Sequence, residues 1–179
     1  MKISGFLLLF LMTFPVFSAD APVPEDPADG MSNEKLASII KRLDDKAGGN
    51  NGFWQLQIEG HEVSVITDEK ADRMRIIVPV TRVESLKDGE LIRLMQSNFD
   101  SALDARYAIA KGIVWSAFIH PLSSLTDHEF ISGLGQTVNL SITFGKGYSS
   151  GALIFRGGDS TDLQRRELID QLLQRGLSI

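Results

Sequence analysis

A serine between glycines is the clearest candidate for chemistry in the chain. Gly147-Tyr148-Ser149-Ser150-Gly151 matches Gly-x-Ser-x-Gly, the string that places a nucleophilic serine between a strand and a helix in one class of hydrolases. That mechanism needs a histidine later in the chain, and all three histidines come earlier. Gly157-Gly158 also disfavours a helix soon after the string. The pattern therefore favours a Gly/Ser loop over a nucleophile, and we expect no catalytic residue.

Two other patterns fall short of a cofactor or metal site. Gly145-Lys146-Gly147 lacks the spacing and the hydroxyl residue of a phosphate-binding loop. His61, His120 and His128 do not have the i, i+3 or i, i+4 spacing of metal-binding pairs on helices. The chain has no cysteine, which excludes thiolate sites, disulfides and iron–sulfur clusters. We therefore expect no cofactor and no metal.

Aromatic side chains are the candidate binding residues. Trp54, Trp115 and Phe118 lie in predicted strands, and Tyr148 lies in the Gly-rich segment. Aromatic residues of a strand usually pack against a covering helix, whereas an exposed aromatic patch marks an interaction site. We take these four residues as the candidate partner-binding surface, with core packing as the alternative for the strand residues.

The first 19 residues have the pattern of an export signal. Lys2 is followed by an apolar run from Phe6 to Phe14, by Pro15, and by small residues that offer cleavage after Ser18 or Ala19. An apolar run this short is below the roughly 20 residues that a membrane-spanning helix needs. We expect a signal peptide over 1–19, no membrane span after cleavage, and a periplasmic or secreted protein.

Composition narrows the class of the remaining chain. The whole sequence is 43% hydrophobic and 23% charged, which is typical of a globular protein. Without residues 1–19 it carries 17 basic and 23 acidic residues, a net charge of −6, so we expect no nucleic-acid partner. Residues 20–31 hold three prolines and four acids, which predicts a disordered lead-in. We expect 32–179 to form one domain.

Apolar periodicity predicts helices at both ends of this domain. A cap at Ser32 or Asn33 starts a stripe from Leu36 to Ala47, and Gly48-Gly49 would end that helix. Near the C-terminus, Thr161 and Gln164 predict a capping box, and Gly176 a stop. The stripe of this last helix is Leu168, Ile169, Leu172 and Leu173.

Two further helices are predicted in the middle of the chain. Asp88 can cap one whose apolar stripe is Ile92, Met95, Phe99 and Leu103. Thr126 and Glu129 form a capping box for the other, which continues to about residue 142. Residues 138–144 also alternate like a strand, so a hairpin of 138–144 with 151–156 is an alternative; the single helix is favoured.

Strands fill the space between the helices. Trp54 to Ile58, His61 to Asp68 and a strand ending near Val80 alternate and are joined by short turns, which predicts an antiparallel meander. A hairpin of 106–110 with 113–120 turns at Lys111-Gly112. Both faces of 113–120 are apolar, which predicts cover on both sides. The fold class is α+β: an antiparallel sheet, three-stranded meander plus hairpin, packed by helices.

This order of elements resembles the YbjN family, whose fold is that of type III secretion chaperones of the CesT (Tir chaperone) class. The resemblance runs from Asn51 to about Gly145. It is carried by the strands Phe53-Trp54-Gln55-Leu56 and Arg75-Ile76-Ile77-Val78-Pro79-Val80, by Leu94, Asn98 and Phe99, and by Ala105-Arg106-Tyr107. The resemblance implies a non-enzymatic protein that binds other polypeptides, often as a dimer. Residues 146–179, with the extra C-terminal helix, extend the basic fold.

The leading hypothesis is therefore an exported, chaperone-like domain that binds a protein or peptide, with an added strand or an apolar helix as the mode of binding. One alternative is a hydrolase or other enzyme that uses the Gly-rich loop 145–158. The other is a structural component of the cell envelope.

Overall fold

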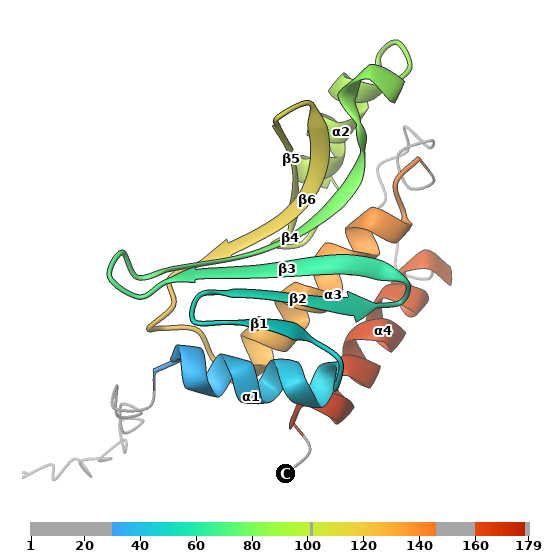
Figure 1. The fold of residues 1–179 in the computed structure, drawn as a ribbon. Helices are drawn as coiled ribbons and strands as arrows, with labels where there is room; N and C mark the ends of the chain where they lie inside the picture. Colours follow the sequence, from blue (N-terminus) through green and yellow to red (C-terminus); the bar gives the residue numbers. More distant parts are fainter. Residues whose placement is uncertain (1–29, 101, 146–159, 178–179) are drawn as a thin grey trace, which may run out of the picture.

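The computed structural model describes residues 30–100, 102–145 and 160–177 (Figure 1). The predicted signal peptide and nearly all of the acidic lead-in lie outside these residues. So does the Gly-rich segment from 146 to 159, with Tyr148 and Ser149. Among the described residues, no helix combines the length and the apolar character needed to cross a membrane.

A six-stranded antiparallel sheet forms the framework, in the order β1-β2-β3-β4-β6-β5. The strands are β1 (Gly48–Asn50), β2 (Phe53–Ile58), β3 (His61–Asp68), β4 (Arg73–Arg82), β5 (Arg106–Ala110) and β6 (Ile113–His120). The predicted meander and hairpin are confirmed, and β6 joins them by pairing with β4. Three two-residue turns have positive φ at both residues, as type I′ hairpin turns require: Asn51-Gly52, Glu59-Gly60 and Lys111-Gly112.

The helices are α1 (Asn33–Leu43), α2 (Glu90–Asp100), α3 (Asp127–Ile142) and α4 (Ser160–Leu177), with a 3-10 turn at Val83–Ser85. Figure 1 shows α3 and α4 crossing one face of the sheet, with α1 at the end where β1 and β2 lie. In contrast, α2 stands apart from these three helices, beside β5. The predicted α+β fold class, including the extra C-terminal helix, is confirmed.

The start of the sheet differs from the prediction. Gly48-Gly49 does not end α1: the helix ends at Leu43, and the two glycines belong to β1, a strand that the sequence did not reveal. The carboxylate of Asp44 causes the early turn, because it accepts hydrogen bonds from the amides of Lys46 (2.9 Å) and Gln57 (2.8 Å). A Cβ atom at Gly49 would lie 2.2 Å from a carbonyl oxygen of β2, so only glycine permits this close pairing.

The third predicted helix is one continuous helix, and the hairpin alternative is wrong for residues 138–142. Its capping box is present: the Thr126 hydroxyl accepts from the amide of Glu129, whose carboxylate accepts from the amide of Thr126. Two glycines remain in this helix because neighbours pack against them. A Cβ atom at Gly133 would meet the Phe118 ring at 2.7 Å, and one at Gly135 would meet Ile169 at 2.8 Å.

Two helix boundaries also need correction. Asp88 does not cap α2, because the carbonyl of Gly89 accepts the bond from Arg93 (3.2 Å) and the helix starts at Glu90. Gly176 does not stop α4, which runs on to Leu177. A Cβ atom at Gly176 would lie 2.5 Å from Ile131, so this glycine permits close helix packing instead of ending the helix.

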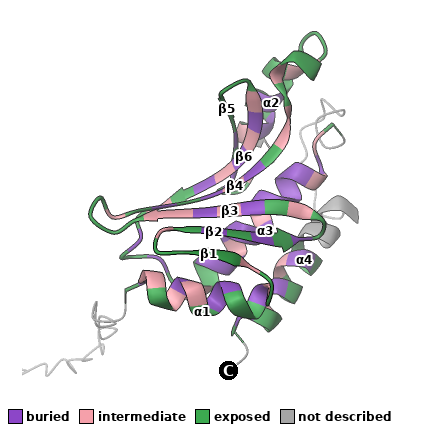
Figure 2. Cartoon of the chain, in the orientation of Figure 1, coloured by how far each residue is buried: buried purple, intermediate pink, exposed green. Residues whose placement is uncertain are grey.

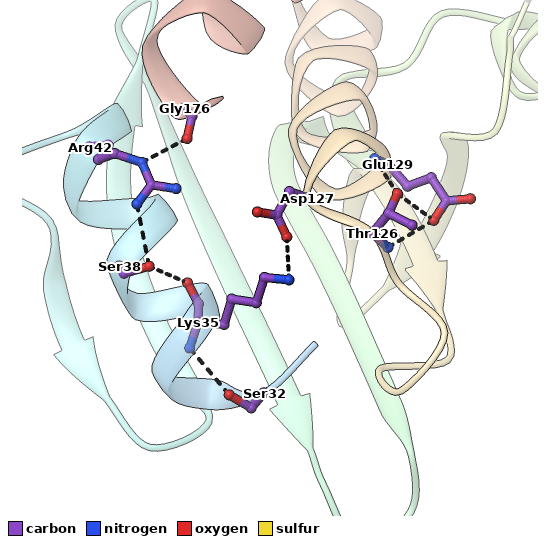
Figure 3. A network of polar contacts seen from close by, with 8 residues as sticks. All are labelled: Ser32, Lys35, Ser38, Arg42, Thr126, Asp127, Glu129 and Gly176. Atoms are coloured by element: carbon purple, nitrogen blue, oxygen red, sulfur yellow. Dashed lines mark hydrogen bonds and ion pairs between the residues drawn. The ribbon is translucent and has the colours of Figure 1, made fainter. Parts of the chain in front are cut away.

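Polar contacts join the helices of the covering layer (Figure 3). Ser32 caps α1 as predicted, its hydroxyl accepting from the amide of Lys35 (3.2 Å). The ammonium of Lys35 lies 3.0 Å from the carboxylate of Asp127 at the start of α3. Near the other end of α1, Nε of Arg42 donates to the carbonyl of Gly176 in α4 (2.7 Å). These contacts hold α1 against both α3 and α4.

Candidate protein-binding surfaces

The predicted apolar stripe of α2 is exposed. Ile92 is 65% exposed, Met95 47% and Phe99 91%, and Leu103 just after the helix is 59% exposed. Ile109 on β5, the strand that α2 contacts, is 46% exposed. Most described residues of α2 are exposed or half-buried, whereas most residues of α3 are buried; Figure 2 shows buried residues along α3. We call Ile92, Met95, Phe99, Leu103 and Ile109 the α2 patch.

The opposite side of α2 explains why the patch points outward. Leu94 is fully buried, and the side chain of Asn98 bonds both backbone groups of Tyr107: its carbonyl accepts from the amide (2.7 Å) and its amide donates to the carbonyl (3.0 Å). Tyr107 in turn donates its hydroxyl to the carbonyl of Leu140 in α3 (2.7 Å). Asn98 therefore fastens α2 to the edge strand, and Ile92 and Phe99, which lie more than about 90° around the helix from both Leu94 and Asn98 on average, face solvent.

A second apolar surface lies on the face of the sheet away from α3 and α4. Along β6, the alternate residues Val114, Ser116 and Phe118 are buried, whereas Ile119 on the other face is 58% exposed. The prediction that both faces of this strand are covered is therefore wrong. Phe53, which is 44% exposed, lies on the same open face. Residues paired across neighbouring strands share one face of a sheet, and the pairs Phe53↔Ile66, Ile66↔Arg75 and Arg75↔Ile119 connect Phe53 to Ile119.

The structure separates the four candidate aromatic residues. Trp54 is 4% exposed and Phe118 6%, so both are core residues, and their strand positions face the helical layer. Trp115 is partly exposed on the open face, and its indole N–H donates to the carbonyl of Ala110 (3.1 Å). Tyr148 lies outside the described residues. Of the three that lie among the described residues, Trp115 is the one whose side chain is partly exposed.

A groove of about 540 Å³ opens where β5 begins and β6 ends. Its lining residues come from β5 and its approach, from the last residues of β6, and from one side of α3: Asp104, Arg106, Phe118, Ile119, His120, His128, Glu129, Ser132 and Gln136. The His120 ring stacks on Phe118 with 6.0 Å between ring centroids, and its Nδ1 donates to the carbonyl of Pro121 (2.8 Å).

Both carboxylates of the groove already have partners. The Asp104 carboxylate accepts from the side-chain amide of Gln136 (3.1 Å). The backbone amide and hydroxyl of Thr126 hold the pKa of Glu129 below its ordinary value, and the nearby His120 and His128 lower it further. Among the described residues, no group of three or more histidines and acids is arranged to hold a metal ion. The groove therefore offers charged and hydrogen-bonding side chains to a ligand.

The remaining histidine is held by α3. Nδ1 of His61 lies 3.2 Å from the hydroxyl of Ser141. His61 and the two histidines of the groove thus have separate surroundings, in keeping with their spacing in the sequence. The serine of the Gly-x-Ser-x-Gly string lies outside the described residues, so its relation to any histidine stays a prediction.

Sequence reasoning missed both the α2 patch and the groove. The i, i+3, i+7 stripe of α2 was visible in the sequence, but a buried stripe and an exposed one have the same sequence pattern. The groove exists because β6 extends beyond the start of β5, and the sequence does not give this strand pairing. Asn98 was the one signal in the sequence for the orientation of α2, because a polar residue four positions after Leu94 lies on the side of the helix that contacts the edge strand.

Comparison with known proteins establishes the fold. No family model matches the chain, and no curated protein matches it. A solved structure, the crystal structure of the ExsC–ExsE complex, contains a chain that matches with a TM-score of 0.54 at 13% identity. The match covers 68% of this chain and 99% of that chain. The protein therefore shares the α+β fold of that chain, while the resemblance to type III secretion chaperones and membership of the YbjN family stay predictions.

Proposed function

We propose that this chain is an exported, non-enzymatic protein-binding domain with a chaperone-like role. The likeness to a chain from a two-protein complex supports the binding of a polypeptide. The export pattern in residues 1–19 supports action in the periplasm or outside the cell. Among the described residues, no group of three or more histidines and acids could hold a metal ion.

The α2 patch is the observation that carries this proposal. Three large apolar side chains on one helix face, together with Leu103 and Ile109 beside them, gather at one edge of the sheet. Contiguous apolar patches of this kind mark interaction sites on soluble proteins. Covering one such side chain is worth about 1.5–3 kcal/mol, so a partner that covers the patch gains several times that amount.

The two apolar surfaces suit two different partners. A second copy of the chain fits the α2 patch, because a helix with a central apolar stripe can pair with its own copy about a two-fold axis. The client polypeptide then binds on the open face of the sheet, where Phe53, Trp115 and Ile119 lie among polar residues. The homodimer presents two such faces to one client.

Affinity capture with matched variants tests the proposal. The purified chain is used to capture proteins from an envelope extract, which are identified by mass spectrometry. Phe99→Glu places a carboxylate in the α2 patch, and Arg93→Glu places the same side chain on an exposed position about 120° around the helix from Phe99. Sedimentation should show a dimer for the parent and Arg93→Glu, and a monomer for Phe99→Glu. A specific client should be lost with Ile119→Glu; equal recovery by all proteins would contradict the proposal.

Export has a separate test. The chain recovered from the periplasmic fraction should begin near Ala19 or Asp20, because cleavage follows the small residues that end the apolar run. N-terminal sequencing gives the answer directly. An intact Met1 on protein found only in the cytoplasm would contradict export. It would not affect the binding proposal, which the capture experiment tests separately.

A further inference from the structure

One end of β6 has a strand neighbour on one side only. On the β4 side, β6 is paired along its whole length, from Arg82↔Ile113 to Met74↔His120. On the β5 side, pairing stops at Arg106↔Ala117. Within the described residues, 118–120 therefore form a short open edge, in line with the start of β5.

The direction of the backbone groups along this edge follows from Asn98. Its side chain bonds the amide and carbonyl of Tyr107, so these two groups of β5 point away from β6. The groups of Arg106 must then point toward β6, where they face Ala117. Backbone groups alternate along a strand, so those of Ile119 point to the same side as those of Ala117, where β5 has already ended.

The open edge at Ile119 faces the groove. Ile119, Phe118 and His120 all line that space of about 540 Å³, and Ser132 and Gln136 of α3 line its other side. This volume can hold a short extended segment, which would lie about 4.8 Å from β6 as a neighbouring strand does. The groove therefore combines an unpaired strand position with a polar wall.

We propose that this groove binds an extended segment of a protein partner, which pairs with Ile119 through two backbone hydrogen bonds and continues the line of β5. The inference rests on the proposed protein-binding function and names its mode. The residue opposite Ile119 is apolar, because the two side chains share the open face. The residues on either side of it are polar, because they face His128, Ser132 and Gln136 of α3.

The neighbouring edge shows why the partner strand binds here. At the outer edge of β5, Asn98 already occupies both backbone groups of Tyr107 and so blocks strand addition at that position. Past the end of β5, the backbone of Ile119 has no strand partner on that side among the described residues, and the groove opens beside it. His120 can also bond the added strand: its Nδ1–H donates to the carbonyl of Pro121, which leaves Nε2 as a hydrogen-bond acceptor.

Hydrogen exchange tests the edge in the free chain. The amide of Ile119 should exchange like an exposed group, whereas the amide of Ala117, which faces β5, should be protected. A protected Ile119 amide in the free chain would show that the edge is already paired, and would overturn the proposal.

Peptide selection then tests the occupant. A phage library of random nine-residue peptides is selected on the purified chain, and the selected peptides are measured against Ile119→Pro and Ile119→Val. Proline removes the outward N–H and is tolerated on a strand edge, whereas valine keeps the backbone donor. We expect polar–apolar–polar peptides that protect the Ile119 amide, bind Ile119→Val like the parent, and bind Ile119→Pro at least about tenfold more weakly.

The outcomes separate this inference from the proposed function. Equal binding to Ile119→Pro would overturn strand pairing, as would peptides that leave the Ile119 amide unprotected. If a client protein is captured with Ile119→Pro as well as with the parent, protein binding stands and the groove is not its site. Failure of both captured clients and selected peptides would remove the proposed function together with the inference.

Discussion

The helices α1 and α2 have the same length and a similar amphipathic sequence, yet the apolar stripe of α1 is buried and that of α2 is exposed. Each is 11 residues long, with charged residues on one side and aliphatic residues on the other. In α1, the apolar residues Leu36, Ile39, Ile40 and Leu43 are at most 4% exposed. In α2, the stripe residues are between 47% and 91% exposed.

The neighbours of the two helices explain this difference. The Lys35–Asp127 and Arg42–Gly176 contacts hold α1 between α3 and α4, where its stripe joins the core. Only the Leu94 and Asn98 side of α2 is used, because it contacts the edge strand β5 and little else. An amphipathic stripe therefore shows that a helix needs an apolar cover, while the fold decides whether the same chain or another provides it.

The largest expected effect is the difference in folding stability between an alanine substitution in the α1 stripe and one in the α2 stripe. Leu36→Ala should destabilise the fold by about 2–5 kcal/mol, because it leaves a cavity in a packed core. Ile92→Ala should change the stability of the monomer by less than about 0.5 kcal/mol, because the side chain is already in solvent. Urea midpoints measured at low protein concentration check both values. Similar losses in the two variants would mean that α2 is covered within the monomer.

A smaller loss is expected for the residue that fastens α2. Asn98→Ala should cost about 2 kcal/mol, because two hydrogen bonds to the Tyr107 backbone are lost and both groups are left without that partner. Gln96→Ala, on the exposed side of the helix, is the control and should stay within about 0.5 kcal/mol of the parent. Hydrogen exchange at Tyr107 should rise only in Asn98→Ala; an unchanged rate would show that Asn98 does not hold the edge.

The capping box of α3 should contribute about 1 kcal/mol. Thr126→Ala removes the hydroxyl that accepts from the Glu129 amide, whereas Thr126→Ser keeps it. The alanine variant should therefore be less stable than the parent, and the serine variant should recover most of the loss. Urea midpoints of the three proteins decide the matter, and no difference between alanine and serine would argue against the cap.

The same cap predicts a small dependence on pH. Hydrogen bonds from Thr126 lower the pKa of Glu129, so the ionised carboxylate stabilises the folded state. This contribution is complete above about pH 4.3, the ordinary pKa of glutamate in an unfolded chain, and is lost as the pH falls through the lowered folded value. Glu129→Gln should therefore show a shallower loss of stability below that pH. Parallel curves for parent and variant would contradict this role.

Much of the fold could be predicted from the sequence because local signals are strong there. The alternation in β2 and β3, the two glycine turns and the Thr126 capping box each determine an element from neighbouring residues alone. Asp44 shows the limit: its carboxylate ends α1 by bonding Gln57, a partner 13 residues away, which no local pattern reveals. The same holds for Gly176, whose role in helix packing depends on Ile131.

The candidate site was harder to predict than the fold. Trp54 and Phe118 were reasonable candidates by residue type, but strand alternation turns both toward the helical layer. Phe99 belonged to a stripe that looked like a core face. Its exposure follows from the position of Asn98 against β5, and only the assembled sheet fixes that position.

The most direct test of the α2 patch is cross-linking from single positions in the living cell. A photoreactive phenylalanine analogue is placed at Phe99, and in a matched protein at Arg93, an exposed residue that lies about 120° around the same helix from Phe99. If the patch is an interface, illumination should join position 99 to a second copy of the chain or to a client protein, and position 93 should give little product. Equal or absent cross-linking at both positions, with both proteins folded and exported, would contradict the account.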